Sequence, residues 1–375
     1  MNFAEIGKMG RIWALLATMF PACGVCRAAE REFLTGADIS MLPVIEKAGG
    51  VFRQNDEPAD AIHILHDHGC SLFRVRLFVK PDPNVARSDG AVQDLDYVRA
   101  LARRIKAVGA TFLLDIHYSD TWADPGKQFT PHDWSGLDFD ALEKRVHDYT
   151  AAVMTDLRDN HALPDMVQVG NEVTAGILWP QGKVLDAPPA TEAEQWARFS
   201  RLLNAGSKAV REFDTPGHRI RIVIHIHGGG REGLPKWFFS KFNRNPVDYD
   251  VVGLSFYPAW NDSIDALKQN MADTIAATGK DVFIAETSYP WREGGGIEKN
   301  SAMRWPLSPA GQKQFVQDLT AVIRAAPQHR GLGFCWWYPE AIPVADLRIW
   351  RGGAEALFDQ HGIALPALDA FGRGN

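Results

Sequence analysis

The amino-acid sequence predicts a single (β/α)8 barrel, an α/β fold in which eight parallel strands alternate with helices. Short apolar runs alternate along the chain with longer segments of helical periodicity, which is the pattern of repeated strand–helix units. The runs are apolar at nearly every position, as expected of parallel strands that are covered on both faces. Polar and aromatic residues follow the runs directly, and barrel enzymes keep their active sites at those strand ends.

The expected strands are separated by segments long enough for a crossover helix. The clearest helix is predicted over residues 95–107, because Leu95, Val98, Leu101 and Ile105 recur at the spacing of one helix face. Similar spacing predicts helices over residues 139–160, 190–213 and 312–325. The expected strands are residues 36–40, 72–78, 111–117, 166–171, 220–226, 251–256, 281–286 and 331–337.

The N-terminus, residues 1–28, is typical of a secretory signal peptide. Lys8 and Arg11 precede an apolar stretch over residues 12–25, and residues 26–28 offer a small-x-small cleavage site. The stretch is too short to span a bilayer comfortably. We therefore expect a secreted or periplasmic protein that is not held in a membrane in its mature form.

Lipidation at Cys23 is the alternative to simple cleavage of the signal peptide. The remainder, residues 29–375, is predicted to be one catalytic domain. The formal charge of −6 argues against a nucleic-acid partner, because such proteins carry a basic patch or stripe. The mature chain keeps Cys70 and Cys335. We interpret them as buried free thiols, and a single disulfide between them is the alternative.

Two expected strands end in a glutamate. The run 167–172 delivers Asn171 and Glu172 to a strand end, and the run 282–287 delivers Glu286. Because the carboxyl ends of barrel strands meet at one mouth, we expect the two carboxyl groups to lie together. Glycoside cleavage needs two such groups, one to protonate the leaving oxygen and one to attack or to activate water. An Asn-Glu pair that only caps a helix is the structural alternative.

Other polar residues at the strand ends fit the same chemistry. Arg74 or Arg76, together with Tyr257, could hold one carboxylate charged, while the other carboxyl, in a drier pocket, would act as general acid. Asn171 is expected to bind a sugar 2-hydroxyl. Each element has a structural alternative: the arginines could pair with Asp38 or Asp115, His225 could be a satisfied strand end, and Trp336-Trp337 could pack the barrel mouth.

The block of residues 115–128, which reads DIHYSDTWADPGKQ, resembles the signature of the endo-β-1,4-galactanases of glycoside hydrolase family 53. The resemblance continues in family order to the end of the chain, starting near residue 34. The further matching blocks are residues 170–172, 176–182, 253–258 and 285–290. The first block is specific to the family, whereas the glutamate blocks alone would indicate only the wider clan A of retaining barrel glycosidases.

The resemblance implies a retaining double displacement on the β-1,4-galactan of type I arabinogalactan, a polysaccharide substrate. It implies that Glu172 is the acid/base and Glu286 the nucleophile, oriented by Tyr257 and by an arginine, for which we place Arg76 first and Arg74 second. The residues expected to contact substrate are Asp38, His117, Asp120, Trp122, Asp124, Trp179, His225 and Trp337.

The sequence departs from the family pattern at three places. Phe78 stands where the family usually has Trp, and residues 225–230 stand where relatives usually have an acidic pair after the first histidine. The segment after Trp337 looks short, so we do not expect the calcium site of some bacterial relatives. We also expect no other metal and no cofactor.

Three other functions compete with this interpretation. Another clan A endo-β-glycanase, a mannanase or glucanase, would use the same two glutamates. A metal-dependent barrel hydrolase would be built on Asp115, His117, His225 and His227, and it leaves the glutamates unexplained. A non-catalytic sugar-binding barrel is the third alternative, and turnover would exclude it.

Overall fold

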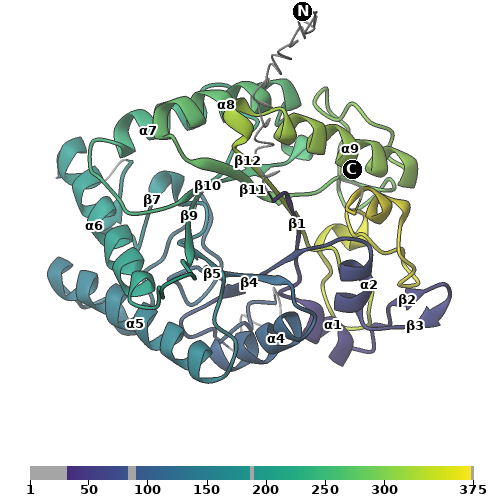
Figure 1. Ribbon diagram of the computed structural model, residues 1–375, viewed down its shortest axis with the longest axis horizontal. Coiled ribbons are helices and arrows are strands. Elements are labelled where there is room, and N and C mark those ends of the chain that lie inside the picture. Colours follow the sequence, from purple (N-terminus) through teal and green to yellow (C-terminus); the bar gives the residue numbers. More distant parts are fainter. Residues whose placement is uncertain (1–31, 83–89, 186–189, 373–375) are drawn as a thin grey trace, which may run out of the picture. The chain divides into compact units, whose positions relative to one another are not determined.

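The structure is a computed structural model that describes residues 32–82, 90–185 and 190–372. The expected signal peptide, residues 1–28, lies outside the described residues. Within them, eight parallel strands close into a barrel in the order β1-β12-β11-β10-β9-β6-β5-β4, with the helices around it (Figure 1). None of the helices in this described part is long and apolar enough to cross a membrane. The predicted (β/α)8 barrel is confirmed.

Each barrel strand falls on one of the eight predicted runs. The largest displacement is at β1, which ends two residues earlier than predicted because Ser40 turns back to bind the Asp38 carboxylate through its backbone N–H and its hydroxyl. The barrel strands are β1 (Leu34–Asp38), β4 (Leu72–Leu77), β5 (Thr111–Ile116), β6 (Met166–Val169), β9 (Arg221–Ile226), β10 (Val251–Phe256), β11 (Asp281–Thr287) and β12 (Gly331–Trp337).

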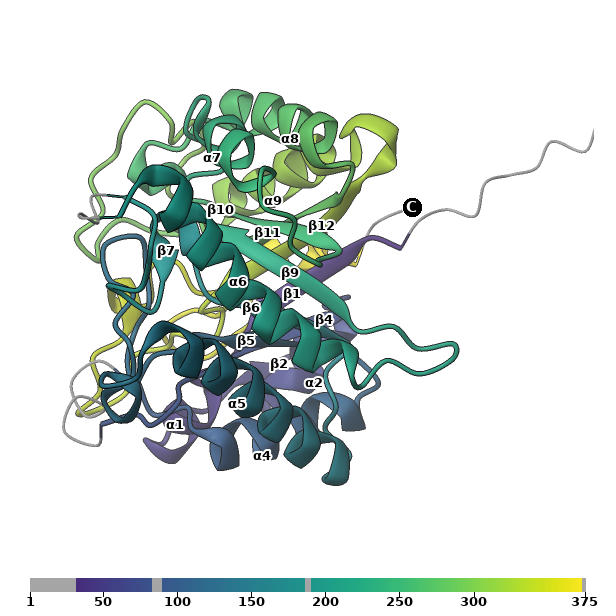
Figure 2. The same cartoon turned by 90° about the vertical axis from the view of Figure 1, so that its left-hand side faces the viewer.

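The helices pack on the outside of the barrel, and α5 and α6 lie across its near side in Figure 2. Helix α4 has the predicted bounds, starts at an Asp94 cap that accepts from the Tyr97 N–H, and buries Val98, Leu101 and Ile105. The α-helices are α1 (Leu42–Lys47), α2 (Ala61–Asp67), α4 (Leu95–Ala107), α5 (Phe139–Asp159), α6 (Glu192–Arg211), α7 (Leu234–Phe242), α8 (Ile264–Thr278) and α9 (Pro309–Arg324).

The described residues also contain short strands and 3-10 turns outside the barrel. They are the hairpin of β2 (Arg53–Gln54) and β3 (Glu57–Pro58), the hairpin of β7 (Gly176–Ile177) and β8 (Gly182–Lys183), and the 3-10 turns η1 (His132–Trp134), η2 (Val173–Ala175), η3 (Pro258–Trp260), η4 (Pro327–His329), η5 (Trp350–Gly353) and η6 (Pro366–Ala370).

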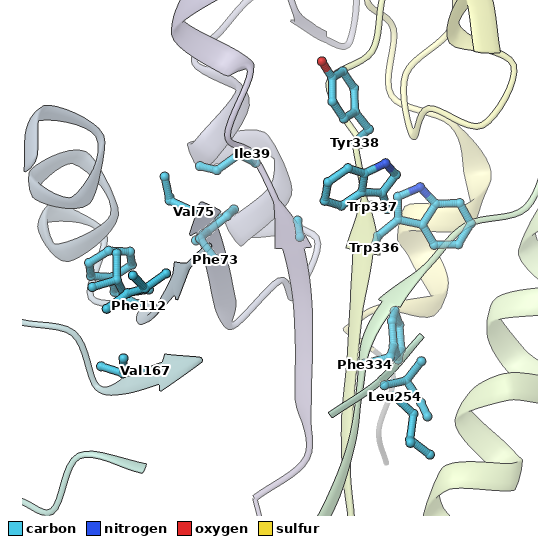
Figure 3. Packing of buried hydrophobic residues seen from close by; sticks show 14 of the residues in the cluster. Ile39, Phe73, Val75, Phe112, Val167, Leu254, Phe334, Trp336, Trp337 and Tyr338 are labelled. Carbon is cyan, nitrogen blue, oxygen red and sulfur yellow. The ribbon is translucent and has the colours of Figure 1, made fainter. Parts of the chain in front are cut away.

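Alternation along the strands separates two kinds of buried residue. Outward-facing residues such as Phe73, Val75 and Phe112 pack between the sheet and the helices, and Figure 3 shows them beside β4 and β5. Trp336 and Trp337 of β12 point to different sides of their strand in the same view. The inner apolar cluster comprises Leu34, Leu72, Leu113, Met166, Val223, Val251, Phe283, Ala285, Leu332 and Cys335.

A polar layer lies above this inner apolar cluster, toward the strand ends. The strand register places Asp38 beside Arg74 of β4 and beside Trp337 of β12. Asp115 of β5 is in turn paired with Gln168 of β6. On β4, β5 and β6, the apolar residues Leu72, Leu113 and Met166 are followed two positions later by Arg74, Asp115 and Gln168 of the polar layer.

The two cysteines of the described chain belong to the apolar part. Cys70 and Cys335 are both buried and free, and burial raises the pKa of both thiols far above the ordinary range. The interpretation of both cysteines as buried free thiols is confirmed.

Candidate active site

A cavity of about 520 Å³ lies at the carboxyl ends of the barrel strands, and both strand-end glutamates line it. Glu172 follows β6 and Glu286 belongs to β11, so the barrel brings them together from separate strands. The other lining residues are Trp122, Ala123, Asp124, Lys127, Asn171, Tyr257, Trp260, Gly295, Trp337, Tyr338, Arg348, Ile349, Trp350 and Arg351.

Glu286 is held by one cation and one hydroxyl. Arg74 Nη1 donates to Glu286 Oε1 at 2.9 Å, and the Tyr257 hydroxyl donates to Oε2 at 3.0 Å. Burial raises the pKa of Glu286, whereas Arg74 and the Tyr257 hydrogen bond act against this rise. Burial and Glu286 raise the pKa of Tyr257 well above its usual value, so its hydroxyl stays protonated and remains a donor.

Arg74 is the centre of the charged layer and is fully buried. Besides Glu286, its guanidinium donates to Asp38 at 3.0 Å, to Asp115 at 2.7 Å and to Asn171 Oδ1 at 2.9 Å. Burial raises the pKa of Asp115, but Arg74 and His117 more than offset this, and its pKa is lowered overall. One cation thus fixes carboxylates from three strands, since a buried charge must be paired.

The structure reverses the predicted ranking of the two arginines. Arg76 does not contact Glu286; its guanidinium lies over the Trp122 ring, 4.3 Å from the centroid, and 5.5 Å from that of Trp337. The register pairs Arg74 with Asp38, and Arg76 is two residues further along β4, about 7 Å closer to the mouth. Arg76 therefore lies level with the aromatic wall. Arg74, not Arg76, is the arginine that contacts Glu286.

Glu172 is placed by a strained turn. Its backbone is left-handed, with φ of 45°, two residues after Gly170, whose φ is 85°. The hydroxyl oxygen of Ser255, on β10, lies 2.6 Å from Glu172 Oε1. Burial and the charge of Glu286 raise the pKa of Glu172 to about 8. This carboxyl therefore keeps its proton at neutral pH.

Asn171 links the charged layer to the loop after β5. Its Oδ1 accepts from Arg74 and from Gln168 Nε2, at 2.9 and 3.0 Å, and its Nδ2 donates to the Ala123 carbonyl at 2.9 Å. The backbone carbonyl of Asn171 accepts from Gln128 Nε2 at 2.8 Å. Both ends of the segment 123–128 are thus attached to the residue that precedes Glu172.

Aromatic rings form one wall of the cavity. Trp122 and Trp337 meet edge to face with centroids 6.0 Å apart, and Arg76 lies against both rings. Phe78 contacts Trp122 at 5.7 Å but is fully buried and does not line the cavity. The departure from the family pattern at Phe78 thus changes a side chain that packs behind Trp122 and does not change a side chain that lines the cavity.

Trp122→Ala is expected to raise KM for galactan oligosaccharides about tenfold, which corresponds to about 1.4 kcal/mol, because the apolar face that can stack on a sugar is lost. Steady-state kinetics measure the effect. Trp237→Ala, at an exposed position on α7 outside the cavity, is the matched control and should leave KM unchanged. An unchanged KM in Trp122→Ala would contradict a sugar-binding role for the wall.

Five of the eight residues expected to contact substrate do not line this cavity. Asp38, His117 and His225 are fully buried or nearly so beneath it. Asp120 accepts from the His132 N–H and shapes its own loop, and the indole of Trp179 donates to the Ala175 carbonyl. The remaining three, Trp122, Asp124 and Trp337, do line the cavity.

The histidines proposed for a metal site are occupied by hydrogen bonds. His117 Nδ1 accepts from the Ala123 N–H at 3.1 Å, so its Nε2 carries the proton and donates to Asp115 at 3.0 Å. His225 contacts Asn171 and Ser255 through its two ring nitrogens. Within residues 32–82, 90–185 and 190–372, His, Cys, Asp and Glu form no group of three or more that could hold a metal ion.

Several site residues were not predicted from the sequence. Ser255 and Gln168 are polar residues in apolar strands, and Ser255 shares a face with Tyr257 two positions later, so alternation could have identified it. Others lie in irregular segments without a periodic signal. They are Lys127, Trp260, Gly295, Tyr338, Arg348, Ile349, Trp350 and Arg351.

A second cavity, of about 310 Å³, adjoins the first one at Glu172. Its lining includes Glu172 and Ser255 but not Glu286, together with His227, Arg231 and Asp262. Burial lowers the pKa of His227 to about 4, so this histidine is uncharged at neutral pH. The segment 225–230, which departs from the family pattern, thus contributes to the side of the site beyond Glu172.

Comparison with known proteins supports one family. The chain is 33% identical over 371 residues to an arabinogalactan endo-β-1,4-galactanase of Cellvibrio japonicus, covering 95% of this chain and 94% of the relative. It is 30% identical to an endo-β-1,4-galactanase of Bacillus subtilis, covering 91% and 86%. Among solved structures, the family 53 catalytic domain of Ignisphaera aggregans superposes with a TM-score of 0.79 at 30% identity, covering 91% and 95%.

The family model described as glycosyl hydrolase family 53 matches residues 34–371. This range begins at the first residue of β1 and ends after the last barrel strand. It contains both glutamates and the lining of both cavities. The chain belongs to glycosyl hydrolase family 53.

Proposed function

We propose that this protein is an endo-acting, retaining glycoside hydrolase that cleaves β-1,4-galactosidic bonds in galactan and type I arabinogalactan. The observation that carries the proposal is the cavity lined by two buried glutamates in different electrostatic surroundings. Arg74 contacts one of them, and no cation of the described residues forms an ion pair with the other, which contacts the Ser255 hydroxyl. Two carboxyl groups that differ in this way suit one nucleophile and one general acid.

The proposed roles follow from those contacts. Glu286, charged through Arg74 and Tyr257, attacks the anomeric carbon. Glu172, protonated at neutral pH, donates its proton to the departing oxygen, and the sugar is left covalently bound to Glu286. Glu172 then takes a proton from water, which attacks the anomeric carbon and releases the product with its configuration retained.

Asn171 is proposed to bind the sugar 2-hydroxyl. Its Oδ1 is fully used by buried donors, whereas Nδ2 has only one of its two N–H groups directed to Ala123. The second N–H is the group available for a sugar oxygen. Because the amide is held from three sides, it is preorganised for a contact that strengthens in the oxocarbenium-like transition state.

The decisive experiment is turnover of linear β-1,4-galactan, with β-mannan and carboxymethylcellulose as matched polymers. We expect reducing ends from galactan alone, and oligosaccharides rather than galactose as early products. Proton NMR of the first products should show the β-anomer. Release from mannan or cellulose at equal rates would replace the proposal by a related clan A glycanase, and α-anomer as first product would exclude the double displacement.

The pH dependence of kcat/KM should be bell-shaped, because turnover needs Glu286 ionised and Glu172 protonated. The pKa of Glu172 is raised to about 8, so the acid loses its proton, and activity falls, above about that pH. Burial also raises the pKa of Glu286 above the ordinary glutamate value of 4.5, against the opposing effect of Arg74. The pKa of Glu286 is thereby raised to about 7, so activity should also fall as the pH decreases below about that value. A profile that is flat above pH 9 would contradict the acid role of Glu172.

We further propose that residues 1–28 direct export and that residues 29–375 form the mature catalytic domain. The basic, apolar and small-residue regions of that segment support export, as does a polysaccharide substrate too large to enter a cell. N-terminal sequencing of protein recovered from the periplasm or the medium tests the cleavage point.

A further inference from the structure

Three buried residues extend from Glu172 into the barrel as a chain of hydrogen bonds. The Ser255 hydroxyl lies 2.6 Å from Glu172 Oε1 and 2.8 Å from His225 Nε2. His225 Nδ1 in turn lies 3.0 Å from Asn171 Oδ1. The hydroxyl has one proton for two contacts of hydrogen-bond length. The donor and acceptor in each of these hydrogen bonds therefore determine which protonation state of Glu172 they stabilise.

The far end of the chain is fixed by Asn171. Its Oδ1 accepts from Arg74 and Gln168, and its Nδ2 donates to the Ala123 carbonyl, so the amide cannot be turned over. His225 Nδ1 consequently faces an acceptor and must carry a proton. The Glu172 backbone N–H approaches the same nitrogen only at 3.5 Å, and this weaker contact does not outweigh the one at 3.0 Å.

His225 is uncharged, so its second nitrogen is an acceptor. It is fully buried, and burial, with Arg74 nearby, lowers its pKa well below the ordinary value. Of the other groups facing it, Asp115 acts in the opposite direction, and His117 and His227 act with Arg74. An imidazole with a proton on Nδ1 has a bare Nε2, which takes the single proton of Ser255.

With its proton committed to His225, the Ser255 oxygen is left as an acceptor toward Glu172. Protonated Glu172 satisfies that contact, and every bond in the chain then has one proton. Ionised Glu172 requires the hydroxyl to turn toward it, which leaves His225 Nε2 2.8 Å from an oxygen without a proton between them. The chain thus favours one protonation state.

We propose that Ser255 and His225 are positioning residues that hold Glu172 in its protonated form between turnovers. This inference rests on the acid/base role proposed for Glu172. As the leaving oxygen takes the Glu172 proton, the Ser255 hydroxyl turns from His225 to the new carboxylate. It turns back when the attacking water delivers its proton to Glu172. Glu286 and Asp124, which also face Glu172, favour the same state, and Arg74 opposes it.

Two substitutions of His225 test the roles of its two ring nitrogens separately. His225→Asn keeps a donor near the position of Nδ1 for Asn171 and removes the acceptor at Nε2. Ser255 is then free to donate to ionised Glu172, and the alkaline limb of kcat/KM should move down by about one pH unit. His225→Gln places an amide oxygen near the position of Nε2, and it should keep the limb close to that of the native enzyme.

The coupling through Ser255 is tested in a Ser255→Ala background, where His225→Asn should produce no further shift. An equal shift with and without Ser255 would overturn the inference, and so would an unshifted limb in active His225→Asn. Nitrogen-15 NMR of histidine-labelled native protein measures the protonation state of His225 directly and tests the inference without a substitution. It should show neutral His225 with the proton on Nδ1, and a proton on Nε2 would overturn the inference. Inactivity of the native enzyme on every glycan would instead reject the proposed function.

Discussion

Glu286→Ala is expected to lower kcat on galactan by at least about 10⁴-fold while leaving the fold intact. The variant removes the only proposed nucleophile, so no covalent intermediate can form. Folding should persist because Arg74 keeps Asp38, Asp115 and Asn171 as partners. Reducing-sugar assays and circular dichroism measure the two effects.

Two further variants sharpen the interpretation of that result. Glu286→Gln preserves the volume of the side chain and should be almost as inactive, which separates the loss of the carboxylate from the loss of packing. Glu298→Ala, at an exposed position beyond β11, should keep native activity. Native-like turnover by Glu286→Ala would require a different nucleophile.

Arg74→Met should produce the largest loss of stability. The substitution leaves Asp38, Asp115 and Glu286 buried without the cation that all three contact, and breaking a buried pair in this way costs about 3–5 kcal/mol. Activity should fall with it, because Glu286 loses the charge that favours its ionised form. Urea denaturation gives the free energy of unfolding, and the deficit should grow as the pH rises, since the unpaired carboxyl groups then have raised pKa values.

Arg104→Met is the matched control for this loss. Arg104 also binds two carboxylates, Glu46 and Asp60, each at 2.7 Å, but its side chain is 32% exposed. Removing such a partly solvated pair should cost roughly 1 kcal/mol or less. Equal losses in the two variants would mean that burial of the charged layer does not determine its contribution.

The sequence predicted the fold well because the barrel strands are short, mostly apolar runs that alternate with longer segments of helical periodicity, and that order is typical of a barrel of parallel strands. The first strand was misplaced by two residues because Ser40 folds back onto Asp38, a local contact that has no apolar pattern. Residues 1–28 lie outside the described part of the chain, and their export function stays a prediction.

The site was harder to predict because alternation along a strand gives the face of a residue but not its depth. Arg74 and Arg76 share a face, and only the register with Asp38 separates the deeper arginine, Arg74, from Arg76, which lies against the Trp122 ring. The same ambiguity affected His117 and His225, which are polar strand-end residues that lie below the cavity. The residues of the segment 348–351 have no periodic pattern to reveal them.

The division between the charged layer and the cavity wall has a consequence for engineering. Arg74 and its partners hold the reacting carboxylate from inside the barrel, whereas Trp350 lies in the 3-10 turn η5, after the last barrel strand. This turn is far in sequence from Arg74 and its partners, so it can be exchanged without them. Grafting the segment around Trp350 from another retaining barrel should therefore redirect the choice of glycan without rebuilding the chemistry.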